Sequence, residues 1–271
     1  MKTILIELGA GIGDDGLLDC AADLARAFGS YVIGLHITPL DAYVSLDPFG
    51  GAYALPSLLE AADEQENKAR EAFEAAMANE SISWEFRSGR GAASSVIAEQ
   101  SRFVDLVLVA KPGREKQYHG RIGHVGELAL TSSAPVLALP PESRSFDPLG
   151  RAVIAWNGSP EASAAVRAAL PMLTKASEVT VLTAEEPGGK WDVPSLELEK
   201  YLSRHGIKVA LEVVIVTDGD LPSSLLREVA DRQPAYLVMG AYGRSRAREW
   251  LLGGVTRHML LDLPVPVLLA H

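Results

Sequence analysis

The sequence predicts an α/β protein built from two tandem doubly wound domains, each with a five-stranded parallel sheet and helices on both faces. Three observations predict this fold. Expected strands and helices alternate strictly along the chain, the strands are continuous apolar runs, and the order restarts at Arg151. Continuous apolar strands are buried on both faces, as in parallel sheets covered by helices. Five-stranded units of this kind have the order 3-2-1-4-5 or 2-1-3-4-5, and ligands bind where the winding reverses.

The segment from Gly89 to Leu139 also recurs, without gaps, 130 residues later in the chain. The repeat pairs Gly240–Gly243 and Gly253–Thr256 of the second half with Ala110–Gly113 and Gly123–Gly126 of the first. A repeat of this length indicates two copies of one domain rather than a solenoid of small repeats. We predict an N-terminal domain at residues 1–140, a Pro- and Ser-rich linker at 141–149 and a C-terminal domain at 150–271.

In the first half, short apolar runs predict strands, and apolar residues that return every three or four positions predict helices. The expected strands are 2–8, 31–37, 82–86, 105–110 and 135–139, and the expected helices are about 14–28, 58–77, 94–100 and 123–131. Residues 39–56 are expected to form a loop. Its length is unusual in a compact domain, which marks it as a lid, a dimer contact or a binding loop.

The second half repeats the same order. The expected strands are 151–156, 178–183, 208–216, 236–239 and 265–269, and the expected helices are 159–173, 195–205, 222–231 and 251–262. Asp218, Gly219 and Asp220 lie between a strand and a helix, where we expect a turn rather than a site of paired acids.

The composition excludes several classes of function. The formal net charge of −10 argues against non-specific binding to nucleic acid or anionic membranes, because no overall positive field attracts phosphates. No apolar run approaches the roughly 20 residues that span a bilayer, and the N-terminus lacks a signal-peptide core, so we expect a cytoplasmic protein. The single cysteine, Cys20, is expected to be a buried structural thiol. The six histidines show no paired ligand spacing, so no metal site is predicted.

A glycine motif in the second half predicts an anion site. Gly240 follows a strand, and Gly253 and Gly254 open a helix, so the backbone can approach a phosphate closely. The N–H groups of Gly254, Val255 and Thr256 have no partner within such a helix, and the positive end of the helix dipole points the same way. The structural alternative is that these glycines only form turns.

Two further features of the second half support a ligand at this place. Arg244, Arg246 and Arg248 concentrate positive charge in an acidic protein. Asn157 ends the first strand of this half, which lies beside the fourth strand in a sheet of order 3-2-1-4-5, so its amide can face a base or ribose. The alternative is that Asn157 or Ser159 only caps the following helix; both hold if Ser159 is the cap.

These motifs resemble the universal stress protein family. The resemblance is carried by the spacing Gly-x2-Gly-x9-Gly, the strand that ends in Met239-Gly240, the segment Leu251–Thr256 and the strand Val265–Leu268, and it covers nearly the whole chain in two copies. It implies tandem domains with the strand order 3-2-1-4-5, a nucleotide of ATP or AMP type, and dimer contacts through the fifth strand.

On this resemblance the second half carries the nucleotide site. The implied cofactor-binding residues are Asn157, Met239, Gly240, Gly243, Arg244, Gly253, Gly254, Val255 and Thr256. Asn157 stands where the family has an Asp that contacts adenine, which keeps an acceptor but removes a charge. Gly254 stands where the family has Ser or Thr, which removes a hydroxyl contact to phosphate but keeps the backbone N–H.

In the first half the motif has decayed. Ala110 replaces the first glycine, Pro112 removes a backbone donor, and His124 stands at the Ser or Thr position. We interpret Leu8 as the counterpart of Asn157. This half is therefore expected to act as a partner of the second domain or to hold a different ligand.

Gly11, Gly13 and Gly16 match the dinucleotide fingerprint G-x-G-x-x-G between a strand and a helix. Asp14 and Asp15 would stand where the pyrophosphate binds and would repel it. The preferred interpretation is a turn followed by an acidic helix start, which the helix dipole favours.

The sequence therefore favours a stress-linked regulatory protein that binds an adenine nucleotide in its C-terminal domain, with a divalent cation such as Mg²⁺ beside the phosphates. No nucleophile elbow, Walker lysine or paired-acid motif is visible, so we predict no catalytic residues and at most slow ATP hydrolysis. A nucleotide-free scaffold and a nucleotide-using α/β enzyme stay open as alternatives. The two copies would form an intramolecular pseudo-dimer, and a homodimer of whole chains also stays open.

Overall fold

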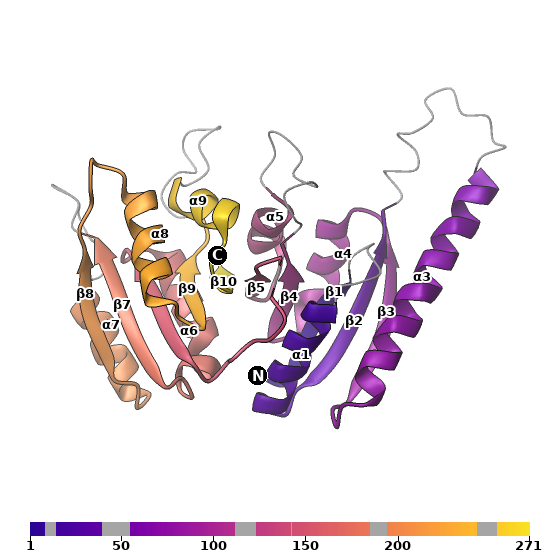
Figure 1. The fold of residues 1–271 in the computed structure, drawn as a ribbon, viewed down its shortest axis with the longest axis horizontal. Coiled ribbons are helices and arrows are strands. Elements are labelled where there is room, and N and C mark those ends of the chain that lie inside the picture. Colours follow the sequence, from indigo (N-terminus) through magenta and orange to yellow (C-terminus); the bar gives the residue numbers. More distant parts are fainter. Residues whose placement is uncertain (9–14, 40–54, 112–122, 142, 185–193, 243–253) are drawn as a thin grey trace. The chain divides into compact units, whose positions relative to one another are not determined.

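The computed structural model describes residues 1–8, 15–39, 55–111, 123–141, 143–184, 194–242 and 254–271 (Figure 1). The chain divides into two compact units. The first unit contains Met1–Ala110, Thr131–Ala134 and Glu142–Phe146, and the second contains Lys111–Leu130, Pro135–Pro141 and Asp147–His271. The last strand of the first half is thus counted with the second unit, whereas the domain boundaries proposed from the repeat stay a prediction.

The first unit is a parallel sheet of order β3-β2-β1-β4. Its elements are β1 (Thr3–Leu8), α1 (Asp15–Phe28), β2 (Tyr31–Thr38), α3 (Leu55–Ala78), β3 (Trp84–Arg90), α4 (Ala93–Gln100), a 3₁₀ turn at Ser101–Phe103 and β4 (Leu106–Ala110). The strand β3 extends further than the sequence predicts, because its polar end pairs with β2 as far as Thr38 and Arg90.

The second unit contains a sheet of order β5-β10-β9-β6-β7-β8. Its elements are α5 (His124–Thr131), β5 (Val136–Leu139), β6 (Arg151–Trp156), α6 (Pro160–Leu173), β7 (Glu178–Ala184), α7 (Ser195–Arg204), β8 (Val209–Val214), α8 (Leu221–Arg232), β9 (Tyr236–Gly240), α9 (Gly254–Asp262) and β10 (Val267–Ala270). The five strands of the second half follow the order 3-2-1-4-5 and pair in parallel, which confirms the predicted fold class.

The strands β5 and β10 pair antiparallel, and this pairing has the symmetry of a dimer contact. Val267 lies opposite Ala138, and Leu268 lies opposite Leu137. Since the repeat relates Leu137 to Val267 and Ala138 to Leu268, each pair is the counterpart of the other. Contacts of this self-complementary kind form two-fold interfaces. The fifth strands therefore form the expected intramolecular pseudo-dimer.

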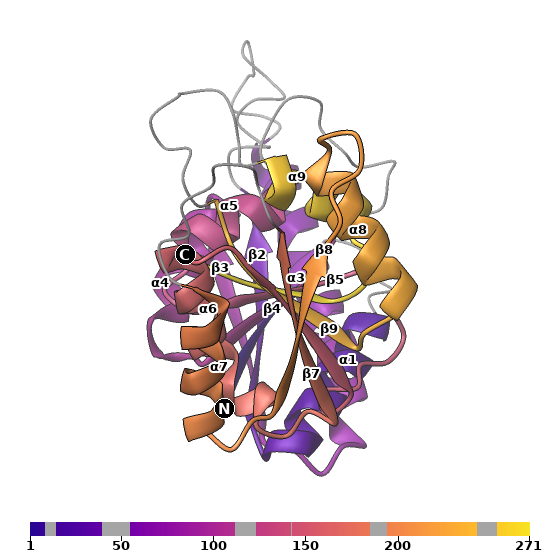
Figure 2. The same cartoon turned by 90° about the vertical axis from the view of Figure 1, so that its left-hand side faces the viewer.

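Helices cover both faces of the sheet in the second unit. Figure 2 shows α6 and α7 on one face and α8 and α9 on the other. The strands between them are buried, including Tyr236, Leu237 and Val238 of β9. Such continuous burial explains why the sequence shows apolar runs instead of alternation.

Local polar contacts confirm several expectations about turns. Asp220 caps α8, because its carboxylate accepts a hydrogen bond from the backbone N–H of Ser223 at 3.1 Å. Hydrogen bonds from Ser223 lower the pKa of Asp220. Asp218 and Gly219 adopt φ values of 54° and 71°, as a tight turn requires. The two acids thus form a turn and a cap.

Residues 143–146 of the proposed linker pack against the first unit. Phe146 is buried, and its backbone N–H donates to the Asp23 carboxylate at 2.9 Å. A Cβ on Gly16 would lie 2.0 Å from the carbonyl oxygen of Ser143. This close approach explains the last glycine of the fingerprint, whereas Gly11 and Gly13 lie outside the described residues.

The structure also bears on the single cysteine and on membrane-spanning helices. Cys20 is fully buried, as expected, and burial, with smaller contributions from Asp23 and Asp19, raises the pKa of its thiol to about 12. In the part of the chain that the structure describes, no helix combines the length and the apolar character needed to cross a membrane.

Candidate functional site

The candidate site lies at the carboxyl ends of β6 and β9. These strands are neighbours, and Ala155 lies beside Met239 in their parallel register. They are the first and fourth strands of the second half, so the winding of the sheet reverses between them. Ligands of doubly wound folds bind at such a switch point. The structure thereby places Asn157, which follows β6, next to the end of β9.

The segment after β6 is a capped turn. The side-chain oxygen of Asn157 accepts a hydrogen bond from the backbone N–H of Ser159 at 3.1 Å, and Gly158 adopts a φ of 71°. The Ser159 hydroxyl accepts from the backbone N–H of Ala162 at 3.1 Å, which confirms Ser159 as the N-cap of α6. Asn157 is exposed. Because its oxygen holds the turn, its amide nitrogen is the group that can donate to a ligand.

Gly240 permits a close approach between β9 and α6. A Cβ at this position would lie 2.5 Å from the backbone nitrogen of Ala162 and 2.6 Å from the carbonyl carbon of Glu161. Backbone atoms cannot move aside as the end of a flexible side chain can. The glycine is therefore required by packing, independently of any phosphate. The side chain of Met239 is buried, so only its backbone can face a ligand.

The first turn of α9 is attached to the end of β9. The Thr256 hydroxyl oxygen accepts a hydrogen bond from the backbone N–H of Tyr242 at 3.4 Å, and both residues are buried. Tyr242 has a φ of 57°, which turns the chain sharply after the strand. Burial raises the pKa of its phenol to about 12. The Thr256 side chain thus joins the first turn of α9 to the end of β9, and its backbone N–H is the group that can donate to an anion.

Gly254 begins α9 and is exposed. Among the described residues, a Cβ there would meet only Pro222 Cγ at 3.8 Å, which is ordinary van der Waals contact. Packing does not require glycine at this position, in contrast to Gly240. The N–H groups of Gly254, Val255 and Thr256 belong to the helix turn that has no carbonyl partners within the helix, so they form a potential anion cradle.

Glu161 is a polar residue of the site that the sequence analysis did not single out. It lies in the first turn of α6, beside Gly240, and its Oε2 atom is buried with no hydrogen-bond partner among the described residues. Buried carboxylate oxygens are normally satisfied, so an unpartnered one indicates a place for a donor. An acid directly after a capping Ser and a Pro is the sequence signal that could have identified it.

Several predicted site residues cannot be placed. Gly243, Arg244 and Gly253, together with Arg246 and Arg248, lie outside the described residues. The structure does bring together Asn157, Gly240 and the first turn of α9. Of the predicted anion cradle, the structure therefore describes the chain up to Tyr242 and from Gly254 onward.

The corresponding place in the first half differs, and one interpretation of it was wrong. Ile4 lies beside Leu106 in β4, and Ala152 lies beside Tyr236 in β9. This register makes Leu8 the counterpart of Trp156, not of Asn157; the counterpart of Asn157 is the following residue, outside the described part. The sequence alone does not show which residues of the two halves correspond here, because the register is set by the pairing of β1 with β4 and of β6 with β9. Ala110 ends β4, and His124 begins α5.

Residues that hold metals do not gather in the described parts of the chain, where no group of three or more His, Cys, Asp or Glu is arranged around a common point.

The fold and the site define a tandem α/β protein with the strand order 3-2-1-4-5 and polar groups at its switch point. The family model described as the universal stress protein family matches residues 1–140 and 149–271. The chain belongs to the universal stress protein family.

Individual relatives agree with this assignment. A universal stress protein of Synechocystis is 26% identical over 175 residues, which cover 60% of this chain and 57% of that protein, so little more than half of the relative is matched. A universal stress protein from Archaeoglobus fulgidus has a similar structure, with a TM-score of 0.74, 18% identity and coverage of 99% of this chain and 95% of that one. A functionally unknown protein from Pseudomonas aeruginosa has a TM-score of 0.59, 15% identity and coverage of 100% and 92%.

Members of the family can bind nucleotides. One universal stress protein has been solved in complex with cAMP; it matches 52% of this chain and 98% of its own length at 18% identity and a TM-score of 0.35. That score is too low to assign any residue of this chain to a ligand contact.

Proposed function

We propose that the second half binds an adenine nucleotide of ATP or AMP type at the switch point between β6 and β9, as a regulatory and not a catalytic event. The observation that carries the proposal is the hydrogen bond between Tyr242 and Thr256, since it holds the first turn of α9 against the end of β9. Unpaired N–H groups at a helix start, beside the switch point of an α/β sheet, are the usual arrangement for phosphate.

The charges of the site orient the proposed ligand. The carboxylate of Glu161 would repel a phosphate placed at the start of α6, but it can accept a hydrogen bond from a ribose hydroxyl. The start of α9 attracts negative charge. We therefore expect the base and ribose near Asn157 and Glu161, and the phosphates near Gly254, Val255 and Thr256. The proposed contacts of Met239, Gly240, Gly243, Arg244 and Gly253 complete this arrangement, with Mg²⁺ beside the phosphates.

The remaining expectations belong to the same proposal. The nucleotide domain would be residues 150–271, and residues 1–140 with the linker 141–149 would form the partner domain with its decayed motif. The protein would act in the cytoplasm.

A nucleotide-free scaffold is the second candidate, and a specific observation favours it. The side-chain oxygens of Asn157 and Thr256 already hold backbone N–H groups, and packing alone explains Gly240. Each of these residues therefore has a structural role without a ligand.

Variants of Gly254 test the proposal, because a Cβ at this exposed position meets no described atom closer than Pro222 Cγ at 3.8 Å. Gly254→Ser restores a hydroxyl at the start of α9, which should tighten ATP about fivefold, the effect of one hydrogen bond. Gly254→Glu places an anion where the phosphates would lie and should weaken ATP at least about tenfold. A carboxylate at a helix start is favourable to the dipole, so this variant keeps the fold.

Isothermal titration of ATP with Mg²⁺ measures both effects, and a thermal shift checks them, because ligand at 100 times its Kd stabilises the native state by about 2.7 kcal/mol. His124→Ser and His124→Glu are the matched controls, since the repeat relates His124 to Gly254. Equal effects in the two halves would contradict the proposed location. No heat and no thermal shift in the unmodified protein and in Gly254→Ser would favour the scaffold.

A further inference from the structure

Glu161 is an acid of the second half whose carboxylate has an oxygen without a partner. The Oε2 atom is buried, and no described residue supplies it with a hydrogen-bond donor. Glu161 lies in the first turn of α6, and its carbonyl carbon would be 2.6 Å from a Cβ on Gly240. The unpartnered oxygen therefore belongs to a residue that packs against the end of β9.

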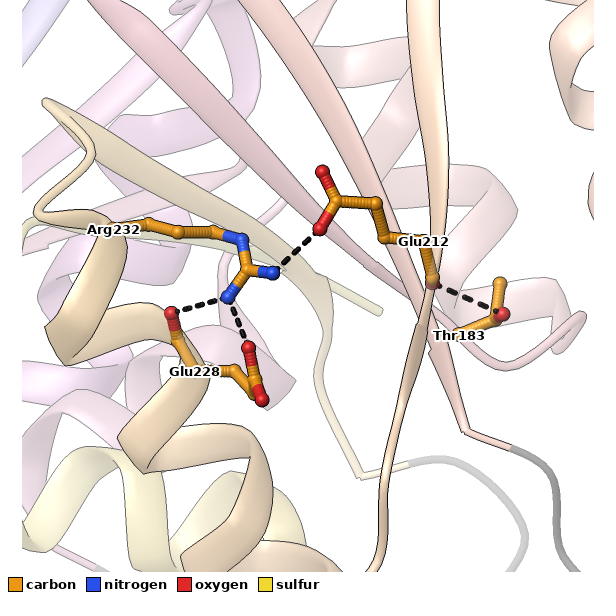
Figure 3. Close-up of polar contacts among 4 residues, drawn as sticks. All are labelled: Thr183, Glu212, Glu228 and Arg232. Atoms are coloured by element: carbon orange, nitrogen blue, oxygen red, sulfur yellow. Dashed lines mark hydrogen bonds and ion pairs between the residues drawn. The ribbon is translucent and has the colours of Figure 1, made fainter.

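Two other acids of this half show how the protein satisfies carboxylates elsewhere. Figure 3 shows Arg232 of α8 between Glu212 of β8 and Glu228 of its own helix. The guanidinium donates to the Glu212 carboxylate at 2.5 Å and also pairs with the Glu228 carboxylate. These two side chains are 43% and 34% exposed, so water also reaches them. The buried oxygen of Glu161 depends more on a donor, yet no described residue provides one.

The position of Glu161 in its helix does not explain this burial. A helix dipole favours an acid in the first turn, but it acts equally on an exposed carboxylate. Glu197 in the first turn of α7 is such a case, because its side chain is 53% exposed and pairs with Lys200 at 2.8 Å. Burial of a carboxylate oxygen without a donor is unfavourable. An incoming hydroxyl group would relieve this cost, whereas an incoming anion would increase it.

We propose that Glu161 makes the site selective for adenine nucleotides whose ribose hydroxyls are both free, and against those that carry a phosphate on one of them. This selectivity rests on the proposed nucleotide site, with the ribose near Asn157 and Glu161. A free hydroxyl donates a hydrogen bond to the carboxylate. A phosphate ester has lost the hydroxyl hydrogen and brings negative charge beside the carboxylate, where burial limits the screening of their repulsion.

The selectivity is opposite to what the start of α9 alone would produce. That helix start attracts negative charge, so an additional phosphate on the ligand would strengthen binding if Glu161 were neutral. With Glu161 charged, the additional phosphate is repelled at the ribose. The discrimination therefore comes from a charge that opposes the wrong ligand as well as from a hydrogen bond to the right one.

Isothermal titration with AMP and with adenosine 3′,5′-bisphosphate tests the proposal, because the two ligands differ only in a phosphate on the ribose. The unmodified protein should bind AMP at least about tenfold more tightly. Glu161→Gln keeps the shape of the side chain and removes its charge. It should weaken AMP about fivefold, since a neutral acceptor makes a weaker hydrogen bond, and it should tighten the bisphosphate, since the repulsion is gone.

Glu197→Gln is the matched control, because it removes the same charge from the first turn of another helix and should leave the ratio of the two affinities unchanged. If the bisphosphate binds to the unmodified protein as tightly as AMP or more tightly, the proposal is overturned while the nucleotide site stands. The same holds if Glu161→Gln shifts both affinities in one direction, as a purely structural role would. If neither AMP nor ATP binds, the proposed function fails and this selectivity fails with it.

Discussion

The third strands of the two halves occupy the same place in the fold but present different surfaces. The strand pairings align Trp84 with Val209, Phe86 with Leu211 and Ser88 with Val213. Arg90 ends β3, and Ile215 directly follows β8. In the first half the row begins with aromatic side chains and ends in polar ones. In the second half the row is apolar to its end.

The helices that cover these strands differ as well. The helix α3 has 24 residues, and its Phe73 contacts Trp84 edge-on, with ring centroids 5.6 Å apart. Arg70 lies over the Phe86 ring at 4.2 Å, and Arg90 pairs with Asp63 at 2.8 Å. The helix α7 has only ten residues, and Leu211, Val213 and Ile215 are exposed. The fold therefore requires apolar side chains on a third strand only where a helix covers it. The uncovered positions can be polar, as in β3, or apolar, as in β8.

The largest expected effect concerns the helix that covers β3. Phe73 is fully buried, and a Cβ on Gly34 would lie 2.7 Å from its ring. Phe73→Ala should lower the free energy of unfolding by about 3–5 kcal/mol, because it leaves a cavity between α3 and the sheet. Urea unfolding followed by circular dichroism measures the loss. Leu196→Ala in α7, where Leu196 is 54% exposed, is the control and should change stability by less than about 0.5 kcal/mol.

The second effect compares the fourth strands. Gly240→Ala should cost about 1–3 kcal/mol, since the new methyl group overlaps the backbone of α6. Its counterpart Ala110→Gly should cost at most about 1 kcal/mol, which reflects the extra chain entropy of glycine. Thermal unfolding of both variants gives the comparison. Equal losses in the two would show that β9 and α6 can move apart.

The third effect concerns pH and the first unit alone. His36 is buried on β2, its Nδ1 has no partner among the described residues, and burial lowers its pKa although Glu66 opposes this shift. The unfolded chain then binds more protons than the native state below about pH 6.5, so stability is present above that pH and is lost as the pH falls. Unfolding free energies measured from pH 7.5 to 5.5 should decline in the unmodified protein and decline less in His36→Leu. An unchanged slope in the variant would assign the pH dependence to other groups.

The smallest effect on stability should come from giving β3 the apolar side chains found at the end of β8. Ser88→Val with Arg90→Ile gives β3 the apolar residues that Val213 and Ile215 supply in the second half, and it should change the free energy of unfolding by less than about 1 kcal/mol, because both positions are exposed. The double variant should nevertheless increase self-association in sedimentation experiments, if side chains at the edge decide pairing. If the double variant stays as monomeric as a Ser88→Thr control, apolar side chains at the edge do not decide whether β3 pairs with another strand.

Sequence patterns predicted most elements because their signals are local. Apolar runs located the buried strands, and Ser159 and Asp220 were correctly placed at helix starts or turns. The strand β3 was predicted too short, since its polar end is held by pairing with β2 and not by burial. The predicted match of Leu8 to Asn157 was wrong by one residue, since the counterpart is Trp156. Register is a property of paired strands and cannot be read from one strand.

For the candidate site, the sequence identified the residues but not the hydrogen bonds and packing contacts that they make. It identified Asn157, Gly240 and Thr256, yet the roles of their atoms depend on neighbours distant in the chain, such as the backbone of Ala162 and Tyr242. Glu161 was missed because a glutamate in the first turn of a helix is ordinary in a sequence. Only the structure shows that its Oε2 atom is buried with no partner in the part of the chain that is described.

The sequence by itself determined the duplication, the α/β class and the positions where glycine, serine and aspartate shape turns, because these depend on local backbone preferences and on hydrophobic periodicity. Only the tertiary structure decided that, among the described residues, Gly240 is needed for packing while Gly254 is not, and that α3 packs on the start of β3 while Leu211 and Val213 of β8 stay exposed. Both distinctions depend on which atoms meet across elements, and the sequence of one segment does not show which distant segment it contacts.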